Sequence, residues 1–493
     1  MKEQSKLSKV LSILLSVVLV VSSFYLLYQV IRLNVLPSKF LFPLTIGVVV
    51  LDAIFILLLI YFSKNVVSKI ICVVLTLLVC AASCMGGYYI SKTQGALSNI
   101  TNVAKHAKNT VSVIVKESSS IKNKSQLNDE SVGSLRLNEQ GSKKVLKELS
   151  GEGIVLNQTE YDSMTALLEA FYNGEVDSII INESSRSQIL DMEAYSNFDS
   201  NTRVVYQTSY KVKNNDSAAA VSDITSKPFN VLISGSDTRG GFDENGRSDV
   251  IMIATVNPKT HTILLTSVPR DFYVTTACDA GDGCMQGALD KITHTGIHGT
   301  NTTKRTVEQL LGIEINYTFK VGFDTVTELV DVLGGVDVYV EPGYATTTSE
   351  FSVHEGVNHL NAQQALAFAR ERYSYTEGDR QRTKNQQQVL MGIVKEATKP
   401  SVITNYAAIM DTMANTFSTT MSNEEITDLI KYQLNNNPTW KMEQYMVDGT
   451  GDTLMCAELG DAASVMVPDQ STVKMAKDKI NAVLAGKSSE DVK

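Results

Sequence analysis

Three long apolar runs near the start of the chain constrain its fold more than any other feature. They occupy residues 10–31, 40–62 and 70–90, and each is long enough to cross a bilayer as a helix. A cleaved signal peptide is a poor alternative, because the first run exceeds a signal's apolar core and two more runs follow closely. The sequence therefore predicts a membrane region over residues 1–92 with three transmembrane helices.

Basic residues predict how this region is oriented. Five lie before the first run or between the second and third, and two lie between the first and second. The five are Lys2, Lys6, Lys9, Lys64 and Lys69, and the two are Arg32 and Lys39. Because basic residues favour the cytoplasmic side, we expect the N-terminus inside the cell and everything after about residue 91 outside it. Only a short tail and loop would remain cytoplasmic, with no room for an output domain.

Asp52 lies in the middle of the second apolar run. A carboxylate at that depth is costly, which makes it a candidate functional residue. The alternative is a protonated or bundle-facing side chain that is hydrogen-bonded to a neighbouring helix. The runs contain no second charge that would form a relay with it, and this favours the alternative.

The remainder of the chain has the composition of a soluble protein. Its 493 residues leave room for further domains, and a net charge of −9 argues against a nucleic-acid partner. Over residues 93–226, apolar strands alternate with amphipathic helices, which predicts a small extracellular accessory α/β domain. Two interpretations of it stay open. It is either a module that senses a ligand or partner, or a spacer that lifts the distal domain off the membrane.

Charged residues gather at the ends of predicted strands over residues 227–274. Apolar runs alternate there with short polar turns, as in several strands of one sheet. The charged residues at these ends are Asp237, Arg239, Arg247, Asp249, Arg270 and Asp271. The carboxylates suggest a hard cation and the arginines an anion such as phosphate, whereas surface turns with ordinary ion pairs are the alternative. Strands and helices keep alternating afterwards, so an α/β or α+β sandwich is expected over residues 227–490.

Cysteines and histidines suggest a disulfide rather than a metal site. Cys278 and Cys284 flank a short loop of small and polar residues, which can close a disulfide if it faces an oxidising compartment. A metal pair is disfavoured, because no second Cys or His pair at ligand spacing accompanies them. His294 and His298 are four residues apart, but Gly296 argues for a turn, so both are expected in a loop near the site.

Four sequence blocks within residues 228–389 together resemble the LytR–CpsA–Psr family of membrane-anchored cell-wall enzymes. The blocks are GSDTR with RSD ten residues after its Asp, then SVPRD, then KITH, then RER with NQQ. The three helices and the intervening domain resemble the capsule or exopolysaccharide branch, named for CpsA. The resemblance implies that the distal domain is the catalytic one, an α/β sandwich with a central mixed sheet.

The resemblance also implies an activity. Family members are thought to transfer a glycopolymer from a polyprenyl-pyrophosphate carrier onto a muramic-acid hydroxyl of peptidoglycan, forming a phosphodiester. The expected partners are the lipid-linked polysaccharide, peptidoglycan and other membrane proteins of polysaccharide synthesis. Two alternatives are a membrane-anchored regulator or sensor of polysaccharide synthesis and a polyprenyl-pyrophosphate hydrolase.

Site residues follow from the same resemblance. Asp237 and Asp249 match the acids that hold Mg²⁺, with Mn²⁺ as a substitute. The positions expected to bind pyrophosphate are Arg239, Arg247, Arg270, Arg370, Arg372, Arg382 and Gln386, and Lys291 is a further phosphate contact. The expected catalytic residues are Asp237, Asp249, Arg270, Arg370 and Arg372. Bidentate arginines suit pyrophosphate, and two carboxylates suffice for Mg²⁺ because phosphate oxygens complete its coordination.

The chain departs from the commoner family pattern at two positions. Gln381 stands where many members have Asp, and Asn385 stands where many have Arg. A detailed role for Arg382 is therefore less well supported than one for its neighbours. Asp271 and Asp379 are the candidates for the base that activates the acceptor hydroxyl, and capping or pairing with an arginine is the alternative for Asp271.

Overall fold

The computed structural model describes most of the chain. The described residues are 6–62, 65–103, 106–213, 219–236, 244–278, 283–399 and 402–492. The chain divides into two compact units. The first comprises Met1–Asn99, Ala397–Ala414 and Ser422–Pro438, and the second comprises Ile100–Glu396, Asn415–Met421 and Thr439–Lys493. The three domains expected from the sequence follow other boundaries, and that division stays a prediction.

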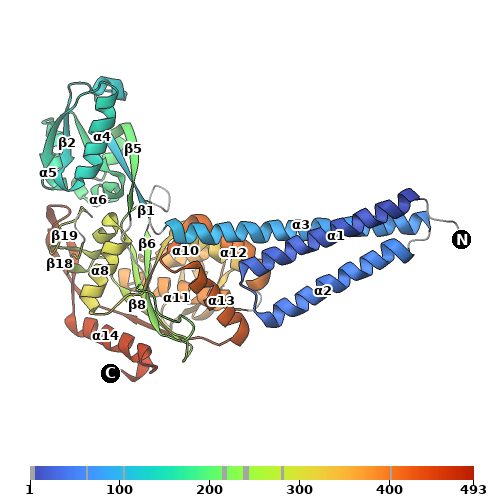
Figure 1. Cartoon of the computed structure of the whole chain (residues 1–493). Coiled ribbons are helices and arrows are strands. Elements are labelled where there is room, and N and C mark those ends of the chain that lie inside the picture. Colours follow the sequence, from blue (N-terminus) through green and yellow to red (C-terminus); the bar gives the residue numbers. More distant parts are fainter. Residues whose placement is uncertain are drawn as a thin grey trace. The chain divides into compact units, whose positions relative to one another are not determined.

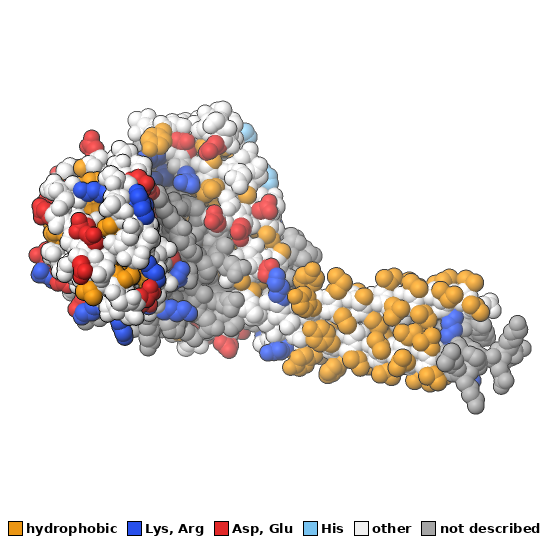
Figure 2. Space-filling view, turned by 90° about the horizontal axis from the view of Figure 1, so that it is seen from above, with side chains coloured by type: hydrophobic (Ala, Val, Ile, Leu, Met, Phe, Trp, Pro, Cys, Tyr) orange, Lys and Arg blue, Asp and Glu red, His pale blue; other side chains and the backbone are white. Residues whose placement is uncertain are grey.

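Three long helices form most of the first unit, as predicted. They are α1 (Lys6–Leu33), α2 (Ser38–Leu57, continued by η1, Leu58–Phe62) and α3 (Val66–Val103) (Figure 1). The spans Lys9–Leu33, Ser38–Tyr61 and Val66–Ala96 are long and apolar enough to cross a membrane. Figure 2 shows hydrophobic side chains covering the rod that these helices make. With 38 residues, α3 is about 57 Å long, which exceeds the thickness of a hydrocarbon core, about 30 Å.

Two contacts explain how these helices pack. The hydroxyl of Ser23 on α1 donates a hydrogen bond to Oδ1 of Asp52 on α2 at 2.8 Å, so the hydrogen-bonded alternative for Asp52 is the arrangement found. Gly87 on α3 lies so close to the Tyr25 ring that a Cβ there would overlap it. Small residues thus allow the close approach of helices that is common in membranes.

Two later helices join the same unit. They are α12 (Val402–Thr416) and α13 (Asn423–Asn436). Nζ of Lys92 on α3 lies 2.8 Å from Oδ2 of Asp411 on α12. Nζ of Lys39, at the start of α2, donates to the carbonyl of Asn435 on α13 at 2.7 Å. Both pairs are exposed, so each contributes little to stability by itself.

The accessory part of the second unit is a five-stranded sheet with helices on both faces. Its strands are β1 (His106–Lys116), β2 (Ser131–Leu135), β3 (Asn157–Tyr161), β4 (Ser178–Asn182) and β5 (Thr202–Lys213), in the order β3-β2-β4-β1-β5. β2 runs parallel to β3 and β4, and β1 runs antiparallel to β4 and β5. α4 (Glu139–Gly151) packs on one face and α5 (Met164–Asn173) on the other (Figure 1).

Local signals explain why α5 and the elements after it form. The Ser163 hydroxyl caps α5 by accepting from the amide of Ala166, and Gly174 ends the helix in a left-handed conformation at φ 80°. The short helices α6 (Arg186–Asp191), η5 (Glu193–Tyr195) and α7 (Phe198–Asn201) follow β4. Arg186 fixes them by pairing with Glu183 and Asp199.

The distal part of the second unit contains the predicted mixed sheet. Its strands are β6 (Phe229–Ser236), β7 (Val250–Asn257), β8 (Thr262–Val268), β11 (Tyr317–Gly322), β16 (Phe417–Thr419) and β17 (Lys441–Met446), in the order β16-β11-β6-β7-β8-β17. β11 is parallel to β6 and β17 to β8, whereas the other neighbours are antiparallel. The predicted fold class, three apolar helices followed by α/β domains with mixed sheets, is therefore confirmed.

Helices cover this sheet, and smaller strands extend the domain. α8 (Thr300–Leu311) and α14 (Gln470–Leu484) share a core with β7 and β8. A second core unites α9 (Phe323–Leu333), α10 (Ala362–Arg370) and α11 (Asp379–Ala397) with β12 (Val336–Val340) and β15 (Gly356–Leu360). The remaining strands are β9 (Tyr273–Thr275), β10 (Leu289–Lys291), β13 (Thr346–Thr347), β14 (Ser352–Val353), β18 (Gly449–Cys456) and β19 (Asp461–Pro468). Cys278 and Cys284, after β9, are joined in a disulfide.

Candidate functional site

Strand pairing brings several charged residues to one edge of the mixed sheet. Gly235 of β6 lies opposite Val250 of β7, and Ile251 lies opposite Val268 of β8. The ends of β6 and β8 therefore meet the start of β7. Asp249 immediately precedes β7, and its amide donates to the carbonyl of Gly235 at 2.8 Å. Arg270 comes two residues after β8, on the same edge.

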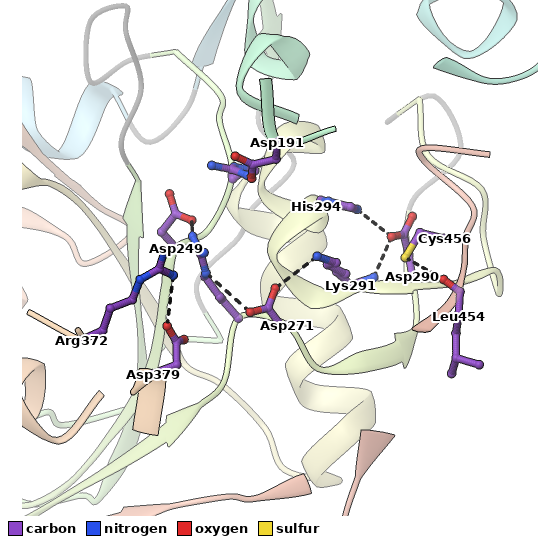
Figure 3. Close-up of polar contacts among 12 residues, drawn as sticks. Asp191, Asp249, Asp271, Asp290, Lys291, His294, Arg372, Asp379, Leu454 and Cys456 are labelled. Atoms are coloured by element: carbon purple, nitrogen blue, oxygen red, sulfur yellow. Dashed lines mark hydrogen bonds and ion pairs between the residues drawn. The ribbon is translucent and has the colours of Figure 1, made fainter. Parts of the chain in front are cut away.

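Arg270 is the centre of a chain of ion pairs. Its Nη1 donates to Oδ1 of Asp249 at 2.7 Å, and its Nε lies 3.8 Å from Oδ2 of Asp271. Nζ of Lys291 lies 3.4 Å from the other oxygen of Asp271 (Figure 3). Burial disfavours the charge of Arg270, but the carboxylates of Asp249 and Asp271 outweigh it and hold the pKa of the guanidinium above its ordinary value.

The first turn of α11 brings a second set of charges to the same place. Oδ2 of Asp379 lies 2.8 Å from Nη2 of Arg382, and its Oδ1 lies 3.8 Å from Nη1 of Arg372 (Figure 3). A small cavity is lined jointly by residues from both parts of the sequence, among them Asp249, Arg270, Asp379, Arg382 and Gln386. We call Arg270, Arg372 and Arg382 the arginine cluster.

Positive charge is crowded in this cluster. Burial, the largest cause, and repulsion from Arg270 and Arg372 lower the pKa of Arg382, and Asp379 opposes this shift only in part. The Nε–H groups of Arg247, Arg270 and Arg382 are buried and have no hydrogen-bond acceptor among the residues that the structure describes. Each unsatisfied buried donor costs about 1–3 kcal/mol. An anion with several oxygens in the small cavity would satisfy the donors of Arg270 and Arg382.

The other expected site residues lie in different surroundings. Arg247 forms an ion pair with Asp191 of the accessory part. Arg372 stacks over the Tyr373 ring, with its guanidinium carbon 4.6 Å from the ring centroid. Arg370 ends α10 with an exposed side chain, outside the lining of the small cavity. Asp237 and Arg239 lie outside the described residues.

The two departures from the family pattern lie on another face of α11. Gln381 and Asn385 are buried, and the Gln381 side chain donates to that of Asn385 at 3.0 Å. Asn385 in turn donates to the carbonyl of Phe368 at 3.1 Å. Arg382 and Gln386, by contrast, line the small cavity. The substituted positions therefore leave the cavity's own charged groups in place.

Both candidate bases take part in ion pairs. Asp271 contacts Arg270 and Lys291, which is the arginine-pairing alternative named for it, and Asp379 contacts Arg382. In this structure, both carboxylates are therefore engaged with basic side chains.

Oxygen donors suited to a hard cation line the small cavity. They come from Asp249, Asp379 and Gln386. Mg²⁺ typically takes one or two carboxylates and completes its coordination with phosphate oxygens and water, so this donor set fits it. In the described ranges, no three or more His, Cys, Asp or Glu residues are grouped to hold a metal by themselves.

The two histidines have structural partners. Nδ1 of His294 lies 2.7 Å from Oδ1 of the buried Asp290, and Nε2 of His298 lies 2.9 Å from Oε2 of Glu458. Although burial opposes the shift, the hydrogen bond from His294 keeps the pKa of Asp290 below its ordinary value. Both histidines lie in the 3₁₀ helix η6 (Ile292–His298), where the sequence predicts a loop.

A larger cavity of about 640 Å³ adjoins the cluster. Its lining includes Arg247, Arg270 and Lys291 together with residues of the accessory part, such as Asp191. The sequence does not predict that accessory residues contribute to this cavity, because they match no motif and lie far along the chain from the four sequence blocks.

Comparisons with known proteins agree with the motif pattern. The LytR_cpsA_psr family model matches residues 194–482. The polyisoprenyl-teichoic acid–peptidoglycan teichoic acid transferase TagU of Bacillus cereus is 31% identical over 238 residues, which are 48% of this chain and 75% of that protein. TagU of Bacillus licheniformis is 32% identical over 46% of this chain and 70% of its own length. A crystal structure of TagU from B. subtilis aligns with a TM-score of 0.41 and 28% identity, covering 52% of this chain and 97% of that one.

Proposed function

The chain belongs to the LytR–CpsA–Psr family, and from this premise we propose that it transfers a lipid-linked glycopolymer to peptidoglycan. The observation that supports the proposal most strongly is the arginine cluster, in which the Nε–H groups of Arg270 and Arg382 are unsatisfied beside the carboxylates of Asp249 and Asp379. A pyrophosphate supplies the oxygens that these donors need. The two TagU relatives, which match this chain over 70% or more of their own length, are named as transferases of teichoic acid to peptidoglycan.

The proposed reaction is a substitution at phosphorus. An acceptor hydroxyl of peptidoglycan attacks the phosphorus that carries the sugar, and a new P–O bond forms. The bond from that phosphorus to the bridging oxygen breaks, and polyprenyl phosphate leaves with the electron pair. The hydroxyl proton passes to a carboxylate, for which Asp271 and Asp379 are the candidates, and from there to solvent.

The protein contributes mainly charge and position to such a step. Guanidiniums of the arginine cluster neutralise the phosphate oxygens, so that the hydroxyl can approach them. Asp237 and Asp249 would hold Mg²⁺ or Mn²⁺, which supplies further neutralisation of the phosphates when bound. Gln386 orients a phosphate oxygen through its amide group.

A capsular or exopolysaccharide substrate is the finer part of the proposal. The named relatives act on teichoic acid, and they match about half of this chain. The family model matches residues 194–482, so the three apolar helices and strands β1–β4 of the accessory sheet precede the matched region, and these are features that resemble the capsule branch. We therefore assign the polymer to that class, with other membrane proteins of polysaccharide synthesis as neighbours.

An assay with the purified full-length chain tests the function. With labelled lipid-linked polymer and peptidoglycan in detergent, we expect label to become wall-bound and polyprenyl phosphate to appear in equal amount. Free polymer phosphate without wall-bound label would indicate a hydrolase. If neither product forms, the regulator becomes the better interpretation.

The orientation of the membrane region is a separate prediction. Both catalytic and accessory parts are proposed to be extracellular, with the N-terminus in the cytoplasm, because basic residues flank the runs asymmetrically. A membrane-impermeant maleimide should label Ser200→Cys, an exposed accessory position, in intact cells. It should label Ser5→Cys only after the membrane is broken. The reverse pattern would overturn this topology.

A further inference from the structure

The larger cavity beside the arginine cluster has walls from two parts of the second unit. One wall consists of Arg247, Arg270, Asp271 and Lys291 from the distal part. The other carries Gln188, Asp191 and Tyr195 from the accessory part. In Figure 3, Asp191 lies above Asp249 and Asp271. At about 640 Å³, the cavity is in the size range that holds small ligands.

Direct contacts hold the two walls together. Arg247 pairs with Asp191 across the cavity's rim. The amide and hydroxyl of Thr165 on α5 both donate to the carbonyl of Leu459, at 3.1 and 3.0 Å. On another side, Lys108 and Thr110 of β1 bind the carboxylate of Glu244 at 2.9 and 2.5 Å. The accessory part is thus fixed to the distal part next to the expected reaction centre.

Gln188 is the residue in this wall that indicates a ligand. It lies on α6, is 2% exposed and lines the cavity. Both its amide nitrogen and its amide oxygen lack a hydrogen-bond partner in the described part of the chain. The hydroxyl of Thr293, on the opposite wall, is also buried and unsatisfied. Buried polar groups are nearly always paired, so these groups call for a polar ligand.

The character of the wall suggests which ligand this is. Tyr195 lines the cavity and stacks on Tyr172, with ring centroids 5.4 Å apart. An aromatic ring with one polar edge, an amide that both donates and accepts, and a hydroxyl together match a sugar, which presents apolar C–H faces and hydroxyl or acetamido groups. Arg270 lines this cavity and the small one alike, so such a sugar would adjoin the bound phosphate.

We propose that the accessory part completes a sugar-binding subsite next to the phosphate site, in which Gln188 binds a hydroxyl or acetamido group. This inference rests on the proposed transferase function. Two sugars with this chemistry meet at the reaction centre, the first sugar of the donor polymer and the acceptor sugar of peptidoglycan. In either case Gln188 is a specificity-determining residue that lies outside the catalytic blocks.

Gln188→Met tests the proposal, with Gln158→Met as the matched control. Methionine keeps the volume of glutamine but removes both unsatisfied polar atoms. Gln158 belongs to the same part of the chain, on the exposed strand β3, away from the cavity. We expect Gln188→Met to melt at the wild-type temperature or above it, and to raise the KM of one substrate about tenfold, the effect of losing one hydrogen bond. Gln158→Met should leave both KM values unchanged.

Varying donor and acceptor separately identifies the sugar. A higher KM for the lipid-linked donor assigns the subsite to the polymer's first sugar, and a higher KM for peptidoglycan fragments assigns it to the acceptor. Unchanged KM values for both, or a lower kcat alone, would overturn the proposal while the transferase function stands. Wild-type protein that transfers nothing would instead remove the function on which the proposal rests.

A blocking substitution covers the case in which Gln188→Met fails to fold. Ala194 is exposed and lines the cavity, so Ala194→Trp adds bulk there without disturbing a core. Its control, Ser200→Trp, adds the same bulk at an exposed position outside the lining. We expect the first substitution to raise the KM of the same substrate and the second to have no effect. Equal KM values for the two variants would contradict the subsite.

Discussion

Replacing Arg270 by alanine is expected to reduce polymer transfer by about a hundredfold to a thousandfold while the protein remains folded. Arg270 is the residue that links the parts of the site. It contacts Asp249 and Asp271, and it lines both the small cavity and the larger one. Its Nε–H is buried and has no hydrogen-bond acceptor among the described residues, so in the proposed reaction it would donate to a phosphate oxygen. The measurement is the rate of labelled polymer attachment by purified protein, with circular dichroism as the check on folding.

Two further variants separate the causes of this loss. Arg270→Lys keeps the charge but cannot make two parallel hydrogen bonds, so a partial loss of rate is expected. Arg380→Ala removes an arginine from α11 that pairs with Asp448 at 2.7 Å and is half exposed, outside the lining of both cavities. It should transfer polymer at the wild-type rate. If Arg270→Ala transferred polymer as fast as Arg380→Ala, the phosphate site would have to lie elsewhere.

Much of the fold can be predicted from this sequence where the hydrophobic pattern is local. The helix Phe323–Leu333 and the strand Val336–Val340 begin and end where apolar spacing and two glycines place them. The polar sequence of residues 378–382 predicts a turn, yet α11 already begins at Asp379, and Asp379 and Arg382 on its first turn line the small cavity. The periodic signal is lost in that turn.

Other elements carry no such pattern. β3 reads Asn-Gln-Thr-Glu-Tyr and is almost fully exposed at the edge of its sheet, so no alternation marks it. The spacing of Tyr161 to later apolar residues predicts that it starts a helix, but it ends β3 instead. Edge strands are defined by their neighbours, which local sequence does not reveal.

The site also contains residues that the sequence predicts and residues that it does not. The motif blocks identify Asp249, Arg270, Arg382 and Gln386, and these line one small cavity in the structure. Nothing in the sequence connects Gln188 or Asp191 to them, because the contact depends on how two parts of one unit pack. A buried glutamine also looks like any other helix residue until its unmade hydrogen bonds are counted.

Asp249 is expected to act as a metal ligand as well as the partner of Arg270, and Asp249→Asn distinguishes the two roles. Asparagine keeps an oxygen that can accept the hydrogen bond from Arg270, which is 2.7 Å in the wild-type site, but it loses the charge that Mg²⁺ requires. If pairing were the only role, the variant would retain most of its rate. If the carboxylate holds a metal, transfer should fall by about a hundredfold or more, as is typical when charge stabilisation at phosphate is lost.

Metal binding can be measured without turnover. Mn²⁺ titration followed by electron paramagnetic resonance should show one site in the wild-type protein that is lost in Asp249→Asn. Asp478→Asn, which alters an exposed carboxylate on α14 paired with Lys474, should keep that site and serves as the control. A chelator should abolish wild-type transfer, and Mg²⁺ or Mn²⁺ should restore it. Full activity in chelator, or an unchanged Mn²⁺ site in Asp249→Asn, would leave the arginines to neutralise the pyrophosphate alone. In that case, the unsatisfied Nε–H groups of Arg270 and Arg382 would have to account for the whole charge stabilisation.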